Sequence, residues 1–245
     1  MFFFSKNKSV LKDLIPDNHI DIHSHLLPGI DDGARTFEDT IQLVQSLQGF
    51  GISEFITTPH IMQYVWDNTR EAILSKAIRT VAALQTENIT VPFRAAAEYL
   101  MDDSFERLFK SNNLLTLKDN FVLVEMSYIN PPMQLYSILF ELQVAGYIPV
   151  LAHPERYLFY HTNFNEYVKL KNAGCLFQLN LLSVVGYYGD DVAKVAAQLL
   201  KKGMYNFVGS DVHHIRHIAA FEERVILKDL VPLHEVIANN QFFRL

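Results

Sequence analysis

Short apolar runs alternate with longer amphipathic runs along this chain, and this alternation constrains the fold more than any other feature. The longer runs repeat apolar residues at helical spacing, as in residues 40–47, 73–84, 135–142 and 192–200. Glycines at positions 51, 146, 174 and 203 follow or end four helical stretches, where helix C-terminal caps are expected. Alternation of strand and helix about seven times predicts an α/β fold, with a parallel sheet wound into a βα (TIM-like) barrel. The expected strands are residues 19–23, 54–58, 91–97, 121–125, 147–153, 175–180 and 205–210.

The length and composition favour one domain. The chain has 245 residues and is 49% hydrophobic, which is enough for a large core, and barrels of this length often form a single domain. We expect an N-terminal extension over residues 1–18 and one barrel domain over residues 19–245. The start, MFFFSKNK, is too short in its apolar part for a signal peptide and is expected to lie on the surface. No apolar run is long enough for a transmembrane helix.

Charge and cysteine content exclude several classes of protein. The net charge is −6 and no cluster of Lys and Arg appears, so a nucleic-acid partner is not expected. The single cysteine, Cys175, rules out an internal disulfide framework and predicts a reducing compartment, the cytoplasm. A cysteine-dependent tyrosine phosphatase needs Cys-x5-Arg, but Leu181 stands six residues after Cys175. That mechanism is therefore excluded.

Nine residues able to ligate a metal lie at the ends of the apolar runs, and none is a cysteine. In a βα barrel, the carboxyl ends of the strands carry the active site, so these side chains can converge there. Five imidazoles and four carboxylates are too many for one ion and suit two or three ions such as Mn, Fe or Zn. A site of that kind usually activates water for attack on phosphorus or carbonyl centres. The nine are His23, His25, Asp32, His60, Glu98, Glu125, His153, Asp211 and His213.

Spacing supports a shared role for these residues. His23 and His25 are alternate residues of one strand, so both imidazoles can project to the same side, and Asp211 and His213 repeat that geometry. Asp31 competes with Asp32 as the ligand from the loop that follows. Taken singly, Glu98 or Glu125 could belong to a buried ion pair, and His60 or His153 could be an ordinary hydrogen-bonded histidine. Their common position at strand ends favours ligation.

Other polar residues near these motifs have alternative interpretations. Arg156 can hold a phosphate through two parallel hydrogen bonds, or it can form a salt bridge to Glu155 or another acid. His214 and His217 are close to the last motif and are not assigned. The remaining histidines, His19, His161 and His234, are expected to be core or surface residues.

The motif order DIHSH, DDG, TPH, AEY, VEMS, AHPERY and SDVH resembles the polymerase-and-histidinol-phosphatase (PHP) superfamily. Within it, the chain resembles the manganese-dependent protein-tyrosine phosphatases of bacterial capsule and exopolysaccharide biosynthesis, over about residues 20–213. The resemblance implies a distorted seven-stranded βα barrel of the PHP type with three metal ions at its C-terminal face. Mn²⁺ is the expected metal, in two or three ions, with Fe, Zn and Mg as alternatives.

The resemblance also implies roles for individual residues. One ion would take His23, His25, Glu98 and Asp211, and Glu98 would bridge to a second ion held by Glu125 and His153. The third would take Asp32, His60 and His213. Arg156 matches the family's phosphate-binding arginine, whereas Arg216 matches a second family arginine only with altered spacing. Four carboxylates and three divalent ions leave the pocket net positive, which suits a phosphate dianion.

These observations predict a metal-dependent phosphomonoesterase acting on phosphotyrosine in protein. Arg156 would stabilise the phosphoryl oxygens, and His60 would serve as general acid besides its ligand role, with water as the alternative proton donor. By resemblance, the partner is the tyrosine-rich tail of a membrane-anchored bacterial tyrosine kinase that controls polysaccharide export. Two alternatives use the same metal chemistry: a small-molecule phosphatase of the histidinol-phosphatase kind and a phosphodiesterase. A metal-binding regulatory module without turnover is an alternative of another class.

Overall fold

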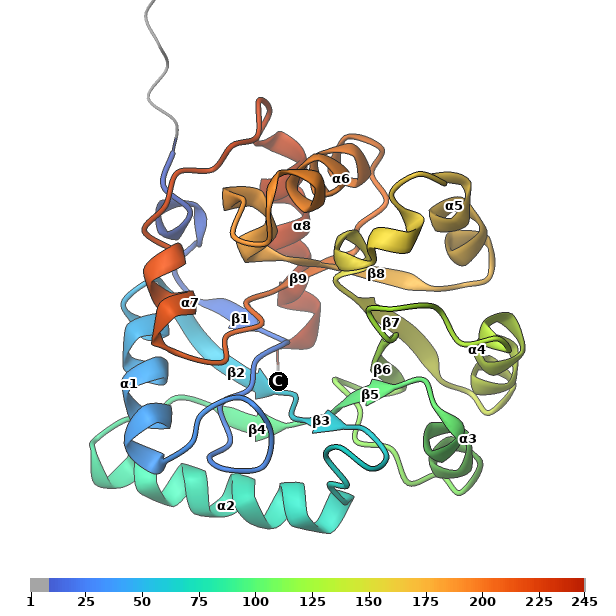
Figure 1. Ribbon diagram of the computed structural model, residues 1–245. Coiled ribbons are helices and arrows are strands. Elements are labelled where there is room, and N and C mark those ends of the chain that lie inside the picture. The colour runs from blue at the N-terminus through green and yellow to red at the C-terminus, as the bar shows by residue number, and fades with distance from the viewer. Residues whose placement is uncertain (1–8, 245) are drawn as a thin grey trace, which may run out of the picture.

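Parallel strands with helices outside them form the fold in the computed structural model, which describes residues 9–244 (Figure 1). The expected surface position of residues 1–8 concerns a segment outside the described residues. The strands form two parallel sheets, ordered β1-β2-β4 and β3-β5-β6-β7-β8-β9. Their bounds are β1 His19–Asp21, β2 Ile52–Thr57, β3 His60–Ile61, β4 Phe93–Ala95, β5 Glu98–Leu100, β6 Phe121–Glu125, β7 Ile148–Ala152, β8 Leu176–Asn180 and β9 Phe207–Gly209.

Nine strands are observed because two of the seven expected strands are each followed, after a short break, by a second short strand. The run that begins at Ile52 breaks before His60, where Pro59 has no N–H to donate to a neighbouring strand. The next run breaks between β4 and β5. Hydrogen bonds from the backbone N–H of Ala96 to Thr57 O (2.9 Å) and of Glu98 to Pro59 O (3.1 Å) cross the break. The parallel α/β architecture is confirmed, whereas one closed sheet of seven strands is not.

Helices surround the strands (Figure 1). Polar side chains cap three of them: the Oγ of Thr36 accepts a hydrogen bond from the N–H of Asp39, Thr69 does the same for Ala72, and Asp102 accepts from Ser104 and Phe105. The α-helices are α1 Phe37–Gln48, α2 Arg70–Thr86, α3 Asp103–Lys110, α4 Leu135–Val144, α5 Asn165–Asn172, α6 Asp190–Lys201, α7 Ile215–Ala220 and α8 Val231–Asn239.

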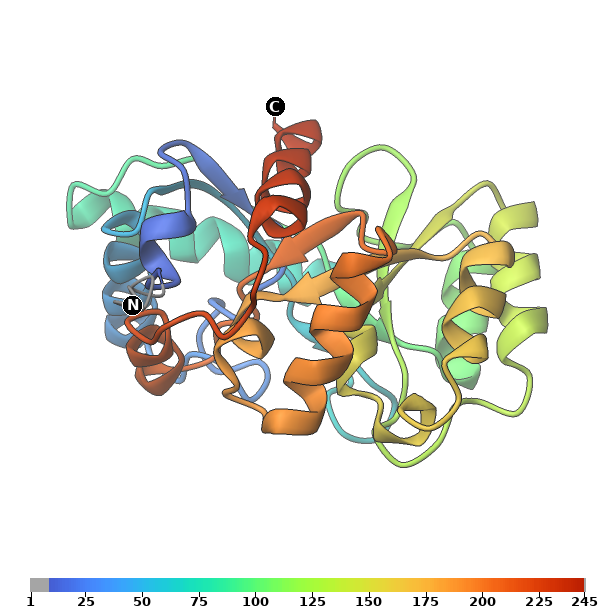
Figure 2. The same cartoon turned by 90° about the horizontal axis from the view of Figure 1, so that it is seen from above.

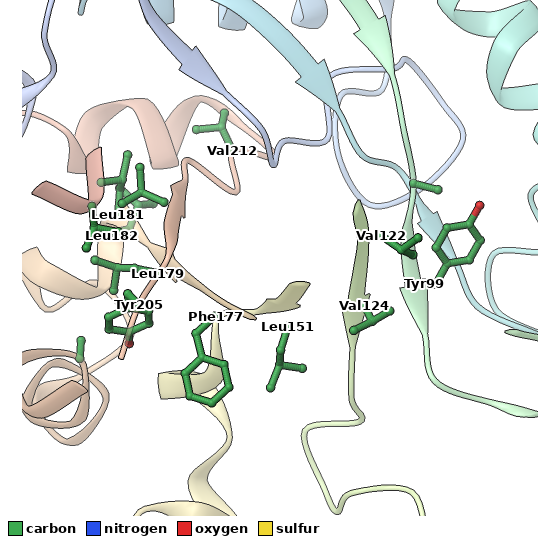
Figure 3. Packing of buried hydrophobic residues seen from close by; sticks show 14 of the residues in the cluster. Tyr99, Val122, Val124, Leu151, Phe177, Leu179, Leu181, Leu182, Tyr205 and Val212 are labelled. Atoms are coloured by element: carbon green, nitrogen blue, oxygen red, sulfur yellow. The ribbon is translucent and has the colours of Figure 1, made fainter. Parts of the chain in front are cut away.

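Alternation along the strands separates two apolar layers. On β6, Val122 and Val124 belong to the large cluster packed between strands and helices, part of which Figure 3 shows. Leu123, between them, belongs to a smaller cluster on the opposite face, together with Val150 of β7. Glu125 follows Leu123 by two residues, so its carboxylate emerges on the same inner face as this smaller cluster. Strand alternation therefore places the carboxylate at the end of β6 on the inner face.

The C-terminal segment joins β1 to β9, which are not neighbours in either sheet. The side-chain amide of Asn240 donates to Ile20 O and Val208 O, both at 2.9 Å, and its oxygen accepts from Val208 N–H at 3.0 Å. Further along, Asp21 accepts hydrogen bonds from the N–H and Oγ of Ser210. Helix α8, which leads into this segment, lies on the side of the molecule opposite the blue loop that precedes α1 (Figure 2). The C-terminal segment therefore provides hydrogen-bond partners for backbone groups of β1 and β9.

Part of the expected N-terminal extension packs against the body of the protein. The backbone N–H of Leu11 donates to Glu223 O, and that of Lys12 donates to Phe221 O, both at 3.0 Å. The Leu11 side chain is fully buried. Within residues 9–244, no helix combines the length and apolar character needed to span a membrane.

Candidate metal centre

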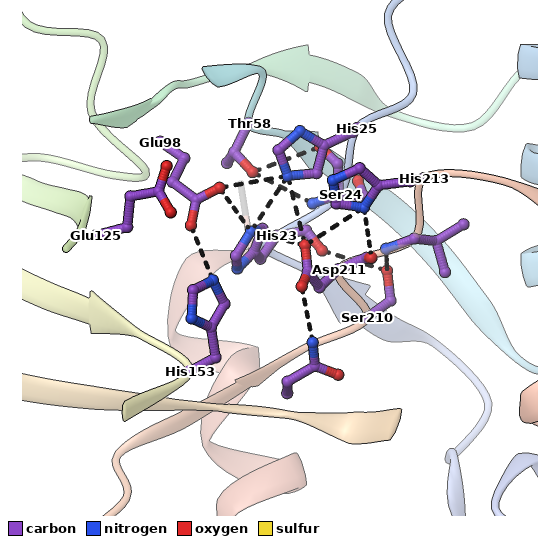
Figure 4. Close-up of polar contacts among 12 residues, drawn as sticks. His23, Ser24, His25, Thr58, Glu98, Glu125, His153, Ser210, Asp211 and His213 are labelled. Carbon is purple, nitrogen blue, oxygen red and sulfur yellow. Dashed lines mark hydrogen bonds and ion pairs between the residues drawn. The ribbon is translucent and has the colours of Figure 1, made fainter. Parts of the chain in front are cut away.

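All nine residues predicted as ligands meet at one place. They form four overlapping groups in which one ligand atom from each residue lies within 4.8 Å of the others. Figure 4 shows the part of the cluster around Glu98 and Asp211. The groups are His25, Asp32, His60 and His213; His23, Glu98 and His153; His23, His25 and Asp211; and His60, Glu98 and Glu125. These residues come from six separated segments of the chain, and the fold brings them together. His60 and Glu98 begin their short strands β3 and β5 and do not end strands, because the interruptions fall just before them.

Glu98 lies at the centre of the cluster. Its Oε2 is 3.2 Å from His23 Nε2, 3.3 Å from His25 Nε2 and 3.2 Å from His60 Nδ1. Its Oε1 is 3.2 Å from His153 Nε2. One carboxylate that faces four imidazoles with two oxygens can bridge neighbouring cations, as the resemblance implies for this residue. The glutamate is fully buried.

A second part of the cluster opens toward solvent. The Oδ1 of Asp32 is 3.5 Å from His60 Nε2 and 3.4 Å from His213 Nε2. The side chain of Asp32 is half-exposed, whereas those of His60 and His213 are mostly covered. The rings of His25 and His213 stack with centroids 3.9 Å apart. This side of the cluster is therefore the accessible one.

Unpaired polar atoms indicate that the cluster is built for cations. His60 Nδ1 and Glu125 Oε1 are buried 2.9 Å apart, but neither makes a hydrogen bond of acceptable geometry to another described residue. Buried polar groups are normally hydrogen-bonded, so a pair that converges without bonding needs another partner. A borderline divalent ion accepts this mixture of imidazole nitrogen and carboxylate oxygen. The donor set therefore fits a metal.

Electrostatics keep the carboxylates charged. Burial alone would raise the pKa of Glu98, but His23 and His60 hold it well below its usual range. For His23 the directions are reversed: burial alone would lower the pKa of the imidazole, but Glu98 and Asp211 raise it to about 10. The pKa of Asp32 is lowered to about 2 because His213 and His60 outweigh the effect of burial. Ionised carboxylates are the form that binds a cation.

Two residues orient the histidine rings. Gln178 Oε1 lies 2.8 Å from His23 Nδ1, which leaves Nε2 of that ring facing Glu98. Asp31 Oδ2 lies 2.8 Å from His25 Nδ1 and also accepts the backbone N–H of His60 at 3.2 Å. Such outer contacts fix the tautomer of a ligating histidine. Asp31 therefore supports the ligands, while Asp32 contributes to the cluster itself, which separates the two rivals.

Sequence reasoning missed Gln178 because it sought charged or imidazole ligands. A signal was nevertheless present: Gln178 and Asn180 alternate with apolar residues in LFQLN, so they face the same side of the strand. Asn180 Nδ2 donates to Asp211 Oδ2 at 2.7 Å. Both amides therefore serve the cluster from β8, the strand that supplies no predicted ligand.

Glycines allow two close approaches of the backbone to the ligands. A Cβ at Gly33 would lie 2.1 Å from His25 O, and one at Gly209 would lie 2.5 Å from His23 Cβ. No side chain fits at such distances. Asp211 and His153 also adopt positive φ angles, 51° and 34°, which are uncommon outside glycine. Such strained residues concentrate at functional sites.

Arg156 lies beside the cluster and is mostly buried. Its Nη1 donates to Asp211 Oδ2 at 2.6 Å, and its Cζ lies 4.1 Å from the ring centroid of Tyr188 and 4.9 Å from that of Tyr128. The expected alternative, a salt bridge to Glu155 or another acid, is observed with Asp211 and not with Glu155. Glu155 instead accepts hydrogen bonds from neutral donors, the hydroxyls of Ser183 and Tyr205 and the N–H of Asn180.

The residues near the last motif that were left unassigned have different surroundings. The backbone N–H of His213 donates to Nδ1 of the buried His217 at 3.1 Å, so His217 supports the turn. His214 and Arg216 line a cleft next to Asp32 and His213. Arg216 is exposed on α7, and within residues 9–244 its guanidinium forms no hydrogen bond or ion pair.

Comparison with known proteins agrees with this geometry. Residues 19–220 match the family described as capsular polysaccharide synthesis, CpsB/CapC. The tyrosine-protein phosphatase YwqE of Bacillus subtilis is 30% identical over 198 residues, covering 80% of this chain and 78% of YwqE. The tyrosine-protein phosphatase CpsB of Streptococcus pneumoniae is 27% identical over 204 residues, covering 80% of this chain and 83% of CpsB.

A comparison with solved structures also matches the chain to tyrosine phosphatases. One from work on YwqE of Bacillus subtilis and CpsB of Streptococcus pneumoniae, described as metal-dependent tyrosine phosphatases, matches with a TM-score of 0.80 at 27% identity and covers 91% of this chain and 93% of its own. The histidinol phosphate phosphatase of Lactococcus lactis shares the fold alone, with a TM-score of 0.50 at 13% identity over 83% of this chain and 90% of its own. The chain belongs to the CpsB/CapC family of capsular polysaccharide synthesis.

Proposed function

We propose that this protein is a metal-dependent protein-tyrosine phosphatase that hydrolyses phosphotyrosine. The observation that carries the proposal is the convergence of nine imidazole and carboxylate ligands around Glu98 in a member of the CpsB/CapC family. Its relatives YwqE and CpsB are named tyrosine-protein phosphatases. Cys175 takes no part, because it is buried on the helix side of the strands, in the large apolar cluster.

The ligands would hold two or three divalent ions, with Mn²⁺ as the proposed metal and Fe, Zn and Mg as alternatives. Such ions neutralise phosphate charge and lower the pKa of water. Glu98, between four imidazoles, would hold the ions at a fixed spacing. Gln178 and Asp31 would keep the rings of His23 and His25 in the ligating tautomer. The geometry of His60, with both nitrogens facing carboxylates, supports ligation more directly than its proposed role as general acid.

Arg156 is the proposed phosphate-binding residue. Its guanidinium contacts Asp211 through Nη1, at the edge of the cluster, and can offer its remaining N–H groups to phosphoryl oxygens. Tyr128 lies next to it, half-exposed, and stacks on His153 with ring centroids 5.8 Å apart. An aromatic face at the mouth of the site suits an aryl ester. The phenol of tyrosine has a pKa of ~10 and leaves more easily than an alkoxide, which reduces the need for a strong general acid.

The proposal also covers the barrel architecture, the domain boundaries, the cellular compartment and the partner protein. We infer that β2 with β3, and β4 with β5, each act as one interrupted strand of a distorted seven-stranded barrel, supported by the parallel bridge between Ser24 and Val212. We further propose that the protein is cytoplasmic, with residues 19–245 as one domain. The proposed partner is the tyrosine-rich tail of a membrane-anchored bacterial tyrosine kinase, which follows from the resemblance alone.

Substrate assays separate this function from its alternatives. Manganese-loaded protein is assayed on phosphotyrosine and phosphoserine peptides, on histidinol phosphate and on an aryl phosphodiester. Preferential hydrolysis of the phosphotyrosine peptide supports the proposal. Preference for histidinol phosphate or for the diester would replace it with a small-molecule phosphatase or a phosphodiesterase. If the protein binds metal but hydrolyses none of these substrates, the result would support a metal-binding regulatory module.

Arg156 is tested in the same assay. Arg156→Ala should keep the metals but lower turnover by roughly 10²–10³, because one preorganised donor to the developing charge is lost. Arg156→Lys should recover only part of the rate, since lysine lacks the planar fork. If Arg156 only holds the loop through Asp211, the alanine variant would melt at a lower temperature while its folded fraction retains the normal rate.

A further inference from the structure

A cleft of about 260 Å³ continues outward from the exposed side of the metal cluster. Asp32 and His213 form its inner wall, and both belong to the predicted ligand set. Its outer walls include Arg35, His214 and Arg216. None of these three residues is used in the proposed hydrolysis, although they lie directly beside the site.

Two separate elements place the arginines. Arg35 precedes helix α1, whose N-cap is Thr36, and Arg216 lies on α7. Helices α1 and α7 contact each other at the edge of the molecule (Figure 1), and residues next to or on both helices line the cleft. Residues more than 180 positions apart in the chain are thus brought to one cleft.

The two arginines of the cleft are not paired with acids of the described residues, although Asp32 and Asp39 also line the cleft. Within residues 9–244, the guanidinium groups of Arg35 and Arg216 form no recorded hydrogen bond or ion pair, and both residues are exposed. The other acid that lines the cleft is Asp39, whose Oδ2 already accepts the backbone N–H groups of Arg35 and Thr36. The buried Nδ1 of His214 also lacks a partner among the described residues. Two guanidinium groups and an imidazole from separate parts of the chain therefore line one cleft.

We propose that this cleft is a binding subsite for a second anionic group of the substrate, a carboxylate or a phosphoryl group close to the phosphotyrosine that is hydrolysed. Guanidinium groups bind both anions with paired hydrogen bonds. The cleft is large enough for one such group and is continuous with the ligands Asp32 and His213. This inference rests on the proposed phosphotyrosine phosphatase function and specifies which peptides that function favours.

Peptide series test the subsite. Manganese-loaded protein is first assayed on a phosphotyrosine peptide in which all neighbouring residues are alanine. In the test peptides, one neighbouring position at a time carries a glutamate, a lysine or a non-hydrolysable phosphonate analogue of phosphotyrosine. We expect kcat/KM to be about fivefold higher with an anion at the favoured position than with alanine, and lower with lysine. The preference should shrink at high salt, because both arginines are exposed.

Variants then assign the effect to the cleft. Arg35→Gln and Arg216→Gln should each reduce the ratio of kcat/KM between the anionic and the alanine peptide, and the double variant should bring it near one. The ratio within one variant is compared, so a general loss of rate cancels. Arg107→Gln, at an exposed position on α3, removes the same charge elsewhere and should leave the ratio unchanged.

The outcomes distinguish failure of the anion subsite from failure of the phosphatase function. A preference for glutamate identifies carboxylates as ligands, and one confined to the phosphonate identifies a second phosphoryl group; either supports the subsite. Equal kcat/KM for all peptides, or a preference that survives the double substitution, would overturn it while leaving the phosphatase function intact. Failure to hydrolyse any phosphotyrosine peptide would instead remove the proposed function.

Discussion

Gly209→Ala tests how tightly β9 and the metal cluster are fitted together. A Cβ at this position would lie 2.5 Å from His23 Cβ and 2.7 Å from Gln178 Nε2. Ordinary contacts begin at 3.4 Å, so the two backbones must separate by about 0.9 Å. A rotamer change cannot relieve this contact, because a Cβ moves only with its backbone. The carbonyl of His23 is also held at 2.7 Å by the N–H of Asp211.

The expected cost of Gly209→Ala follows from that separation. Overpacking of this kind destabilises by roughly 1–3 kcal/mol, which for a chain of this size lowers the melting temperature by roughly 2–12 °C. A displacement of about 1 Å in the ligands should lower turnover by about 10². Bound metal should also fall, because His23 and Gln178 move together. Gly49→Ala, at the end of α1 with φ of −60° and its nearest atom at 3.2 Å, is the control and should change little.

The assay for Gly209→Ala combines melting temperature, metal content by elemental analysis, and turnover of an aryl phosphate. A variant with full metal content, normal turnover and an unchanged melting temperature would refute the reasoning. It would mean that β9 is not packed against His23 as described.

Other substitutions probe separate parts of the structure. Gln178→Leu should weaken metal binding by roughly 10–100-fold in a chelator competition, because His23 loses its orienting partner; unchanged affinity would contradict that role. Cys175→Ser should keep normal turnover, since burial raises the pKa of the thiol to about 12, although the buried hydroxyl should cost roughly 1–3 kcal/mol in urea unfolding; a trapped phosphocysteine would contradict it. Burial lowers the pKa of His19 from 6.5 to about 4, so the unfolded chain binds the proton more readily and stability should fall by about 3 kcal/mol as pH drops from about 6.5 to 4. In metal-free protein, His19→Leu should lack this component, and an identical pH profile for both proteins would exclude it.

Strand alternation made much of the cluster predictable. Polar residues at the ends of apolar runs must meet once the strands are parallel, so the convergence of residues as distant as His23 and Asp211 follows from the sequence pattern. The breaks before His60 and Glu98 were not predictable from that pattern, because apolar periodicity does not reveal where a hydrogen-bond ladder is interrupted.

Neutral partners were harder to predict than charged ligands. Asn240 satisfies the backbone between β1 and β9, but its segment reads only as helix in the sequence. Its role depends on two strands that the chain separates by nearly its whole length. Gln178 carried a usable signal in its alternation with Asn180, whereas the choice between Asp31 and Asp32 required the distances to His25 and His60. Tertiary contacts of this kind are decided by packing and not by local sequence.

The most direct test of the account is to titrate metal into stripped protein while turnover of a phosphotyrosine peptide is followed. The account predicts no hydrolysis by the stripped protein, and a rise in rate with added Mn²⁺ that saturates at two to three ions bound per chain by elemental analysis. Glu98→Ala should bind fewer ions and show little turnover at any metal concentration. Full activity in rigorously stripped protein, or a Glu98→Ala variant with normal metal content and rate, would contradict the central claim.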